Sequence, residues 1–276
     1  MFEILKQKPK LEKQILQVGE IAQYLWQNGW AERNAGNISV NVHEYLEDND
    51  FEDLNEYPVF ALSTVYSELA GKYFFVTGTG KRMRDLARAP MKNAIIIRIA
   101  DDGASYTMIS RFKSETYEFR PTSELPTHLG IHQLIARRGS KEKVIIHTHA
   151  NELVALTHNP QFKSAEALNH MLWGMHPEAM VFVPKGIGFV PYILPGSQEI
   201  ALETIKNLQN HDIVLWEKHG VFAIGESVLD TFDTIDIIAK SAKIYFMCKN
   251  AGFEPEGLSI EQLNELKELV KKFSAG

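Results

Sequence analysis

The chain has 276 residues, of which 29 are Lys or Arg and 35 are Asp or Glu, so its formal charge is −6. Apolar residues make up 45% and charged residues 23%, which is typical of a folded globular protein and excludes disorder as the main state. The single cysteine excludes a disulfide scaffold, and a pI near 5.9 without a basic tail argues against nucleic acid as the main partner.

The first residues lack the apolar segment and cleavage site of a secretory signal. No run approaches the roughly 20 apolar residues that a membrane span needs. We therefore expect a cytoplasmic protein that does not associate with membranes. No repeat and no low-complexity linker interrupts the sequence, so we expect one domain over residues 1–276.

The first half of the chain mixes helix and strand patterns. Apolar residues at helical spacing predict a helix over about 11–28, which Asn28-Gly29 would end. A polar, acidic stretch over 43–57 is typical of a surface segment. A second helix should begin near Ser123, whose hydroxyl can cap free backbone amides. Strands are predicted at 37–42, 73–76, 94–99 and 106–109, the last two joined by a turn at 101–103.

The second half adds further strands and three helices. A core strand over 143–149 ends in polar residues, which suits a strand that carries side chains to a site at its tip. Other strands are predicted at 180–183, 187–190, 213–216 and 221–224. Helices are predicted over 197–210, over 227–249 and after a capping box of Ser259 and Gln262. This mixture indicates an α/β or α+β layered domain.

The sharpest chemical signal is His147-Thr148-His149. Alternate residues of a strand project to the same face, so both imidazoles can reach one cation. A third histidine, His219, also follows an apolar strand. Three neutral histidines with an open coordination position are typical of a catalytic metal site, and zinc fits this set best. Taken alone, such a histidine pair can also be merely polar residues at a strand end.

A competing arrangement lies on the second predicted helix. Glu124, His128 and His132 are spaced by four residues, so one helical face could present a carboxylate and two imidazoles. The zinc-protease motif requires Glu at position 129, where Leu129 stands. We therefore interpret His128 and His132 as surface or hydrogen-bonded histidines. Glu124 lies at a helix start and is either a capping acid or a carboxylate aimed into a cleft.

Two segments rich in small residues could bind phosphate. They are Arg33-Asn34-Ala35-Gly36-Asn37 and Thr77-Gly78-Thr79-Gly80-Lys81, which offer backbone amides with hydroxyl or carboxamide donors. Neither matches a nucleotide-binding fingerprint, and each could be a simple turn. A nucleophilic serine elbow is also lacking from the sequence.

Together these segments resemble the class II aldolase and adducin-head family. The matching motifs run in order over most of the chain. They include Trp30-Ala31-Glu32-Arg33-Asn34, Thr77-Gly78-Thr79-Gly80-Lys81, Thr122-Ser123-Glu124-Leu125-Pro126, His147-Thr148-His149 and His219-Gly220-Val221-Phe222. The resemblance is closest to the branch that cleaves L-rhamnulose 1-phosphate into dihydroxyacetone phosphate and L-lactaldehyde, a step of rhamnose metabolism. It implies a three-layer αβα sandwich with a largely antiparallel central sheet.

The resemblance also implies a role for each site residue. His147, His149 and His219 match the Zn²⁺ ligands, and Glu124 matches the carboxylate that moves the C3 proton and binds the metal when substrate is absent. Glu178 matches an acid that reaches the neighbouring subunit's site in a cyclic homotetramer. The phosphate contacts match Asn34, Gly36, Asn37, Thr79, Thr122 and Ser123, with Thr79 at a position where serine is expected.

Two alternatives remain open at this point. The same metal site serves other enzymes of ketose phosphates, such as L-fuculose-1-phosphate aldolases, ribulose-phosphate aldolases, pentulose-phosphate 4-epimerases and thiosugar-phosphate dehydratases. Adducin-like heads use the fold as an interaction module without the metal histidines. Retention of His147, His149, His219 and Glu124 argues against that non-catalytic role.

Overall fold

The computed structural model describes residues 3–51, 54–109 and 119–274. Within this part of the chain, nine strands form one sheet in the order β2-β5-β4-β3-β1-β6-β9-β8-β7. Neighbouring strands are antiparallel except for the parallel pair β7 and β8. The strands are β1 (Asn37–Asn41), β2 (Val59–Ala61), β3 (Tyr73–Thr77), β4 (Ala94–Ile99), β5 (Ser105–Ile109), β6 (Val144–Thr148), β7 (Ile187–Val190), β8 (Ile213–Trp216) and β9 (Gly220–Gly225).

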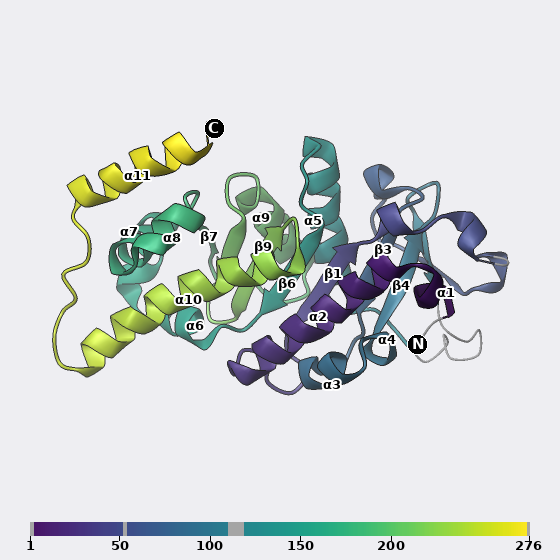
Figure 1. Cartoon of the computed structure of the whole chain (residues 1–276), viewed down its shortest axis with the longest axis horizontal. Coiled ribbons are helices and arrows are strands. Elements are labelled where there is room, and N and C mark those ends of the chain that lie inside the picture. Colours follow the sequence, from purple (N-terminus) through teal and green to yellow (C-terminus); the bar gives the residue numbers. More distant parts are fainter. Residues whose placement is uncertain (1–2, 52–53, 110–118, 275–276) are drawn as a thin grey trace.

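Helices cover both faces of this sheet, and α2 and α10 cross one of them (Figure 1). Helices α5 and α9 pack together on the opposite face. The helices are α1 (Glu3–Gln7), α2 (Pro9–Gln27), α3 (Met83–Arg88), α4 (Pro90–Asn93), α5 (Leu125–Arg138), α6 (Asn151–Leu156), α7 (Ala165–Met175), α8 (Pro177–Phe182), α9 (Gln198–Asn207), α10 (Val228–Asn250) and α11 (Ile260–Ser274). Short 3₁₀ turns include η4 (Ser67–Leu69).

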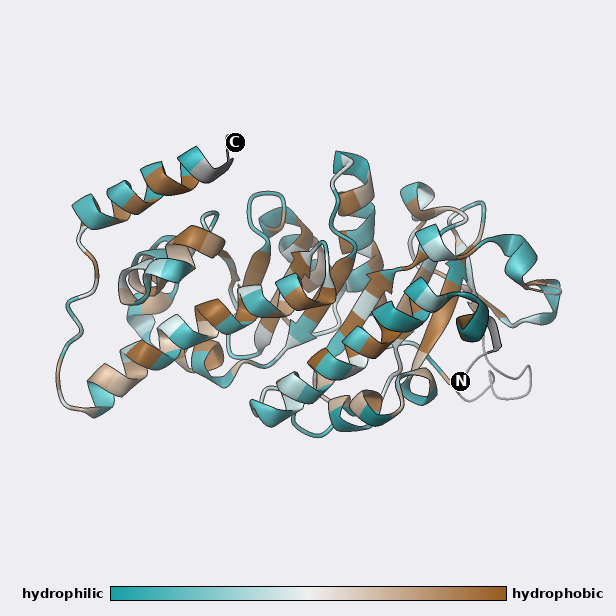
Figure 2. Cartoon of the chain, viewed as in Figure 1, coloured by the Kyte–Doolittle hydropathy of each residue, from teal (hydrophilic) through white to brown (hydrophobic). Residues whose placement is uncertain are grey.

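The alternation of side chains along the strands separates two cores. On β1, Ile38 and Val40 are fully buried against the layer of α2 and α10. On β6, Ile145 points to the opposite layer, where it packs with Ile131 and Ile135 of α5. Figure 2 shows the strands as mainly hydrophobic and the outer faces of the helices as hydrophilic. The fold is therefore the three-layer αβα sandwich, with a largely antiparallel sheet, that the family resemblance implies.

The strand register brings several chain segments to one end of the sheet. β1 lies between β3 and β6, and its first residue, Asn37, pairs with His147 of β6. Ser39 pairs with Val76 near the end of β3, so the loop after β3 begins beside Asn37. The turn between β8 and β9 reaches the same end because Thr148 pairs with Val221.

Most predicted elements lie where expected, and several strands have the predicted bounds. Two predictions are wrong. Residues 180–183 lie in and directly after helix α8, since Pro177 suits a first helical turn and the four-residue apolar run is too short to show a period. Ser123 does not cap α5, because the N-cap residue is Glu124, whose amide donates to Thr122 Oγ1 (3.3 Å).

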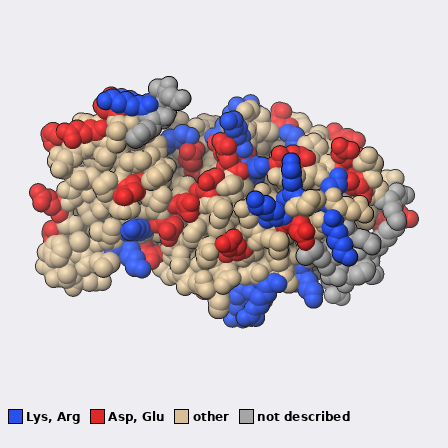
Figure 3. All heavy atoms as spheres, in the orientation of Figure 1, with Lys and Arg blue, Asp and Glu red and all other residues tan. Residues whose placement is uncertain are grey.

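The surface carries mixed charge. Acidic and basic side chains are interspersed over the face that carries α2 and α10 (Figure 3). Helix α11 follows an extended segment and lies at one end of the molecule, where it contacts α8 (Figure 1). In the described residues, no helix has both the length and the apolar character needed to cross a membrane.

Candidate metal centre and active site

Three histidine side chains meet at the end of the sheet. His147 lies in β6, and His149 is the residue directly after that strand. His219 lies in the turn between β8 and β9. The ring centroids of His147 lie 5.2 Å from those of both His149 and His219, and the last two rings are 4.9 Å apart. One ligand atom from each residue lies within 4.8 Å of the others. This cluster has the separation that a single metal ion requires.

The protein environment favours neutral imidazoles, which are the form that binds metals. Burial and the neighbouring His149 together lower the pKa of His147 to about 3. Burial and the nearby His147 likewise lower the pKa of His219 to about 4. Phe222 stacks on the His147 ring at 4.3 Å, and Trp216 lies 5.1 Å from the His219 ring. Apolar neighbours thus hold two of the three ligands.

Hydrogen bonds also determine which ring nitrogen of His147 and of His149 faces the middle of the histidine cluster. His147 Nδ1 lies 2.9 Å from the carbonyl oxygen of Val221, which can only accept a hydrogen bond. His149 Nδ1 lies 2.9 Å from Glu32 Oε1 in the same way. With the proton on Nδ1, each Nε2 keeps a free lone pair, as is usual for metal-binding histidines. The donor set therefore fits a divalent metal ion.

The turn that carries His219 has a constrained backbone conformation. Lys218 has φ of 59°, a left-handed conformation that non-glycine residues rarely adopt. Its amide donates to Thr157 Oγ1 (2.9 Å), which ties the turn to the end of α6. A Cβ atom at Gly220 would lie 2.4 Å from the carbonyl oxygen of Thr148, so only glycine allows β9 to approach β6 this closely.

Glu124 lies beside the histidines as the N-cap residue of α5. Its Oε2 is 3.6 Å from His147 Nε2 and accepts a hydrogen bond from Asn37 Nδ2 at 2.7 Å. Burial raises the pKa of Glu124, while the hydrogen bond from Asn37 and the nearby His219 and His149 side chains oppose that rise. A buried carboxyl group with a raised pKa beside a histidine cluster is a candidate for proton transfer.

A cavity of about 190 Å³ joins these groups. Every site residue that the sequence predicts lines it except Glu178. No lysine or arginine is among its described lining residues, so an anion there would be held by amides, hydroxyls and carboxamides. Gly36 has φ of +79°, and a Cβ atom there would lie 3.0 Å from the carbonyl oxygen of His147. This glycine lets the loop before β1 approach the metal ligands.

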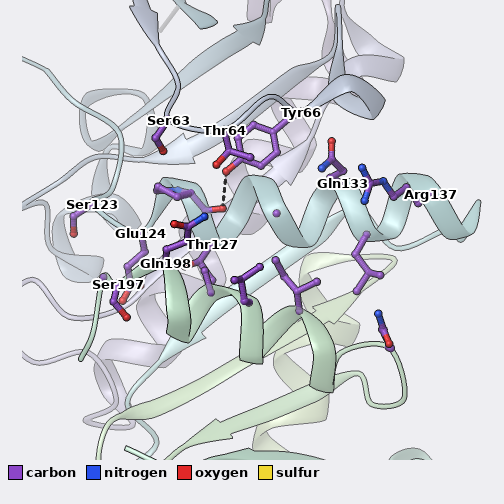
Figure 4. Close-up of a pocket in the computed structure, with 18 residues that line it drawn as sticks. Ser63, Thr64, Tyr66, Ser123, Glu124, Thr127, Gln133, Arg137, Ser197 and Gln198 are labelled. Atoms are coloured by element: carbon purple, nitrogen blue, oxygen red, sulfur yellow. Dashed lines mark hydrogen bonds between the residues drawn. The ribbon is translucent and has the colours of Figure 1, made fainter. Parts of the chain in front are cut away.

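A larger cavity of about 450 Å³ adjoins the first through Ser123 and Glu124 (Figure 4). It runs along α5 toward Gln133 and Arg137, with α9 forming another wall. Tyr66 closes part of it and donates a hydrogen bond to the carbonyl oxygen of Pro126 (3.2 Å). Glu124 therefore faces a second space in addition to the histidine cavity.

The sequence did not predict the groups behind Glu124. His128 and His132 are hydrogen-bonded, as expected, but both are buried rather than on the helix surface. Ser39 of β1 contacts both rings, and the sequence analysis did not single it out. Ser39 stands at a polar position of an alternating strand, so nothing in the local sequence shows that it is buried. The alternative metal set of Glu124, His128 and His132 does not form, because Asn37 and Ser39 lie among these side chains.

Glu178 lies apart from the other predicted residues. It is in the first turn of α8, its side chain is 52% exposed, and its Oε2 is 2.9 Å from His176 Nε2. Within one chain it does not line the histidine cavity. Any contact with an active site would have to be with that of another subunit.

Comparisons with known proteins agree with this geometry. Residues 17–246 match the family described as the Class II Aldolase and Adducin N-terminal domain. A rhamnulose-1-phosphate aldolase of Bacteroides thetaiotaomicron is 47% identical over 96% of this chain and 97% of its own. One of Klebsiella pneumoniae is 35% identical over 90% of this chain and 88% of its own. The crystal structure of a Thermotoga maritima sugar-phosphate aldolase has a TM-score of 0.73 at 31% identity, covering 90% of this chain and 100% of that one.

The chain therefore belongs to the class II aldolase and adducin family. The named relatives and the histidine cluster identify it as an aldolase of the metal-dependent class, an enzyme that makes or breaks carbon–carbon bonds. A non-catalytic adducin-like role is not supported by these relatives.

The histidine cluster leads to a first prediction. We expect His147→Ala to lower Zn²⁺ bound per subunit by about tenfold or more at limiting free metal. A residue that binds the metal directly contributes at least as much to metal affinity as the residues that hydrogen-bond to such ligands. Elemental analysis after dialysis against a metal buffer measures this. His158→Ala, which removes an exposed histidine after α6, is the control. Equal zinc content in the His147 variant and wild type would contradict the assignment.

Proposed function

We propose that this chain cleaves L-rhamnulose 1-phosphate reversibly to dihydroxyacetone phosphate and L-lactaldehyde, with Zn²⁺ as its cofactor, in rhamnose catabolism. The observation that carries the proposal is the convergence of three imidazoles, one buried carboxyl group and an uncharged anion cradle in one cavity. The names of the two curated relatives support the choice of this ketose phosphate.

The residues divide the work of the reaction. His147, His149 and His219 hold the ion, which when bound supplies a Lewis acid for negative charge that develops on the substrate oxygens. Glu124 removes the proton from C3 of dihydroxyacetone phosphate in the direction of synthesis. In cleavage, the C4 hydroxyl gives its proton to Glu124 as its oxygen becomes the aldehyde carbonyl, the electron pair of the C3–C4 bond remains on C3, and Glu124 then gives the proton to that carbon.

The same cavity offers neutral donors for the phosphate group. Asn34, Gly36, Thr79, Thr122 and Ser123 line the cavity with neutral donors, and the proposal assigns the phosphate to them together with Asn37. Such donors hold a dianion without neutralising it, so the substrate keeps its charge and its orientation. The reacting carbons then lie between the phosphate and the histidines.

A panel of ketose 1-phosphates tests the proposed substrate. We expect zinc-loaded enzyme to release dihydroxyacetone phosphate fastest from L-rhamnulose 1-phosphate, compared with L-fuculose and L-ribulose phosphates. A coupled glycerol-phosphate dehydrogenase assay measures the product. Removal of zinc by a chelator should abolish the rate, and adding zinc back should restore it. Faster cleavage of another ketose phosphate would move the assignment to that substrate, and full activity without metal would reject the mechanism.

The role of Glu124 gives a separate prediction. We expect Glu124→Gln to lower kcat by about 100-fold or more, because general acid–base catalysis contributes at least this much and the amide cannot exchange the proton. Zinc content should stay at the wild-type level, since the three histidines are unchanged. Steady-state kinetics with elemental analysis measure both quantities. An unchanged kcat would remove Glu124 from the chemistry.

We further propose that the chain is a single catalytic domain that acts in the cytoplasm as a homotetramer. In this assembly Glu178 of one subunit assists the aldehyde half of the substrate in the next. Its exposure at the start of α8 supports this role, as does the exposed Phe182 at the end of the same helix. Closed symmetric rings bring such a surface to an adjacent site in every subunit.

Subunit complementation tests the shared site. We expect Glu124→Gln and Glu178→Gln enzymes each to be impaired when alone. Mixed tetramers should regain about a quarter of the wild-type rate. At about a quarter of their subunit junctions, one subunit supplies an intact Glu124 and its neighbour supplies an intact Glu178. Co-expression with two affinity tags isolates these mixtures, and tetramers of each single variant are the controls. No recovery in the mixed tetramers would place Glu178 outside the neighbouring site.

A further inference from the structure

Five buried polar side chains from α5 and β1 form a continuous line of hydrogen bonds that ends at Glu124. His132 Nε2 lies 2.9 Å from Ser39 Oγ, and the same oxygen lies 2.7 Å from His128 Nδ1. His128 Nε2 contacts Asn37 Oδ1, and Asn37 Nδ2 lies 2.7 Å from Glu124 Oε2. Each of these residues is 9% exposed or less, so water does not substitute for the contacts.

The donors and acceptors of this line have one consistent direction. An ionised carboxylate only accepts, so Asn37 turns its NH₂ group to Glu124 and its oxygen to His128. His128 must then carry its proton on Nε2, which leaves Nδ1 as an acceptor for the Ser39 hydroxyl. Ser39 in turn accepts from Nε2–H of His132. Every hydrogen bond in the line therefore donates toward Glu124.

The surroundings of the two histidines keep both rings neutral. Burial holds the pKa of His128 well below its usual value and lowers that of His132 to about 3. Phe74 lies 4.7 Å from the His132 ring, and Phe222 meets the His128 ring edge-on at 5.6 Å. A neutral imidazole has one donor and one acceptor, which is what the direction of the line requires.

We propose that His128 and Ser39 are positioning residues for Glu124. They fix the amide of Asn37 so that its NH₂ group always faces the carboxylate. A reversed amide would direct an oxygen lone pair at Glu124 and an N–H at the Nε2–H of His128. The line orients the carboxylate and does not transfer its proton, because a carboxamide neither gains nor loses a proton near neutral pH. The inference rests on the proposed role of Glu124 in moving the C3 proton.

Two substitutions of His128 separate orientation from folding. In His128→Asn the shorter side chain can accept from Ser39 but cannot reach Asn37. In His128→Gln the amide nitrogen occupies roughly the place of Nε2 and can still donate to Asn37. We expect zinc-loaded His128→Asn to lose about tenfold or more in kcat for L-rhamnulose 1-phosphate, since small misplacements of a reacting group are costly. His128→Gln should recover most of this loss.

The accompanying measurements distinguish positioning from general damage. In His128→Asn, zinc per subunit and KM should stay within about twofold of wild type, because the metal ligands and the phosphate cradle are unchanged. Equal kcat for the two folded, zinc-loaded variants would overturn the proposal. If His128→Asn fails to fold, Ser39→Ala replaces it, because loss of the hydroxyl releases the His128 tautomer while the ring and its Nε2 remain. An unchanged kcat in Ser39→Ala would then overturn the proposal.

A spectroscopic measurement does not depend on activity. Long-range ¹H–¹⁵N spectra of the zinc-loaded wild type should show His128 with a protonated Nε2 and an unprotonated Nδ1. The signal is assigned by its loss in His128→Gln. A proton on Nδ1 would overturn the inferred direction even in a fully active enzyme. If the wild type cleaves no ketose phosphate, the proposed function fails, while the tautomer still decides whether the line is ordered as inferred.

Discussion

The site depends on the register of β1 against β6. Asn37 pairs with His147, so the amide that donates to the Glu124 carboxylate and a histidine of the cluster lie side by side at the end of the sheet. Because side chains alternate, Asn37 and Ser39 face α5, whereas Ile38 faces the apolar layer of α2 and α10. A slip of one residue would bury both polar groups among apolar side chains and expose the aliphatic ones to α5. The hydrophobic pattern of β1 therefore specifies the active-site geometry as well as the fold.

The environment of Glu124 combines two opposed effects. Burial disfavours the ionised carboxylate, while the hydrogen bond from Asn37 stabilises it. The low polarity that makes burial costly also strengthens each hydrogen bond that remains. An ordered line of neutral donors behind the carboxylate suits this balance better than a buried cation, which would hold the pKa far below neutrality and weaken Glu124 as a base. Burial keeps His128 and His132 neutral because it lowers the pKa of both rings.

How much of the site the sequence could predict depends on how far apart along the chain the interacting residues lie. The pair His147 and His149 is a local pattern, so strand alternation alone predicts a shared face. His219 joins them only through the pairing of β6 with β9, and the family resemblance supplied that contact in advance. Ser39 meets His128 across 89 positions of sequence, and no local pattern encodes the register that joins them. The same limit explains residues 180–183, where tertiary packing selects a helix for an apolar run that local preference leaves ambiguous.

Within the described residues, two backbone positions with strained conformations lie beside the site. Arg33 and Lys218 are non-glycine residues with positive φ, and they precede Asn34 and His219. Each such conformation costs about 1 kcal/mol for a residue with a side chain. The second is held by Thr157, and the His219 amide donates to the carbonyl oxygen of Trp216 (3.2 Å). Rigid strands thus support His147 and Asn37, whereas two strained loops carry His219 and Asn34. The sheet fixes the turn of Lys218 at both ends, through β8 and β9, whereas the loop of Arg33 is fixed by α2 at one end and by β1 at the other, and these anchors hold the strained conformations in place.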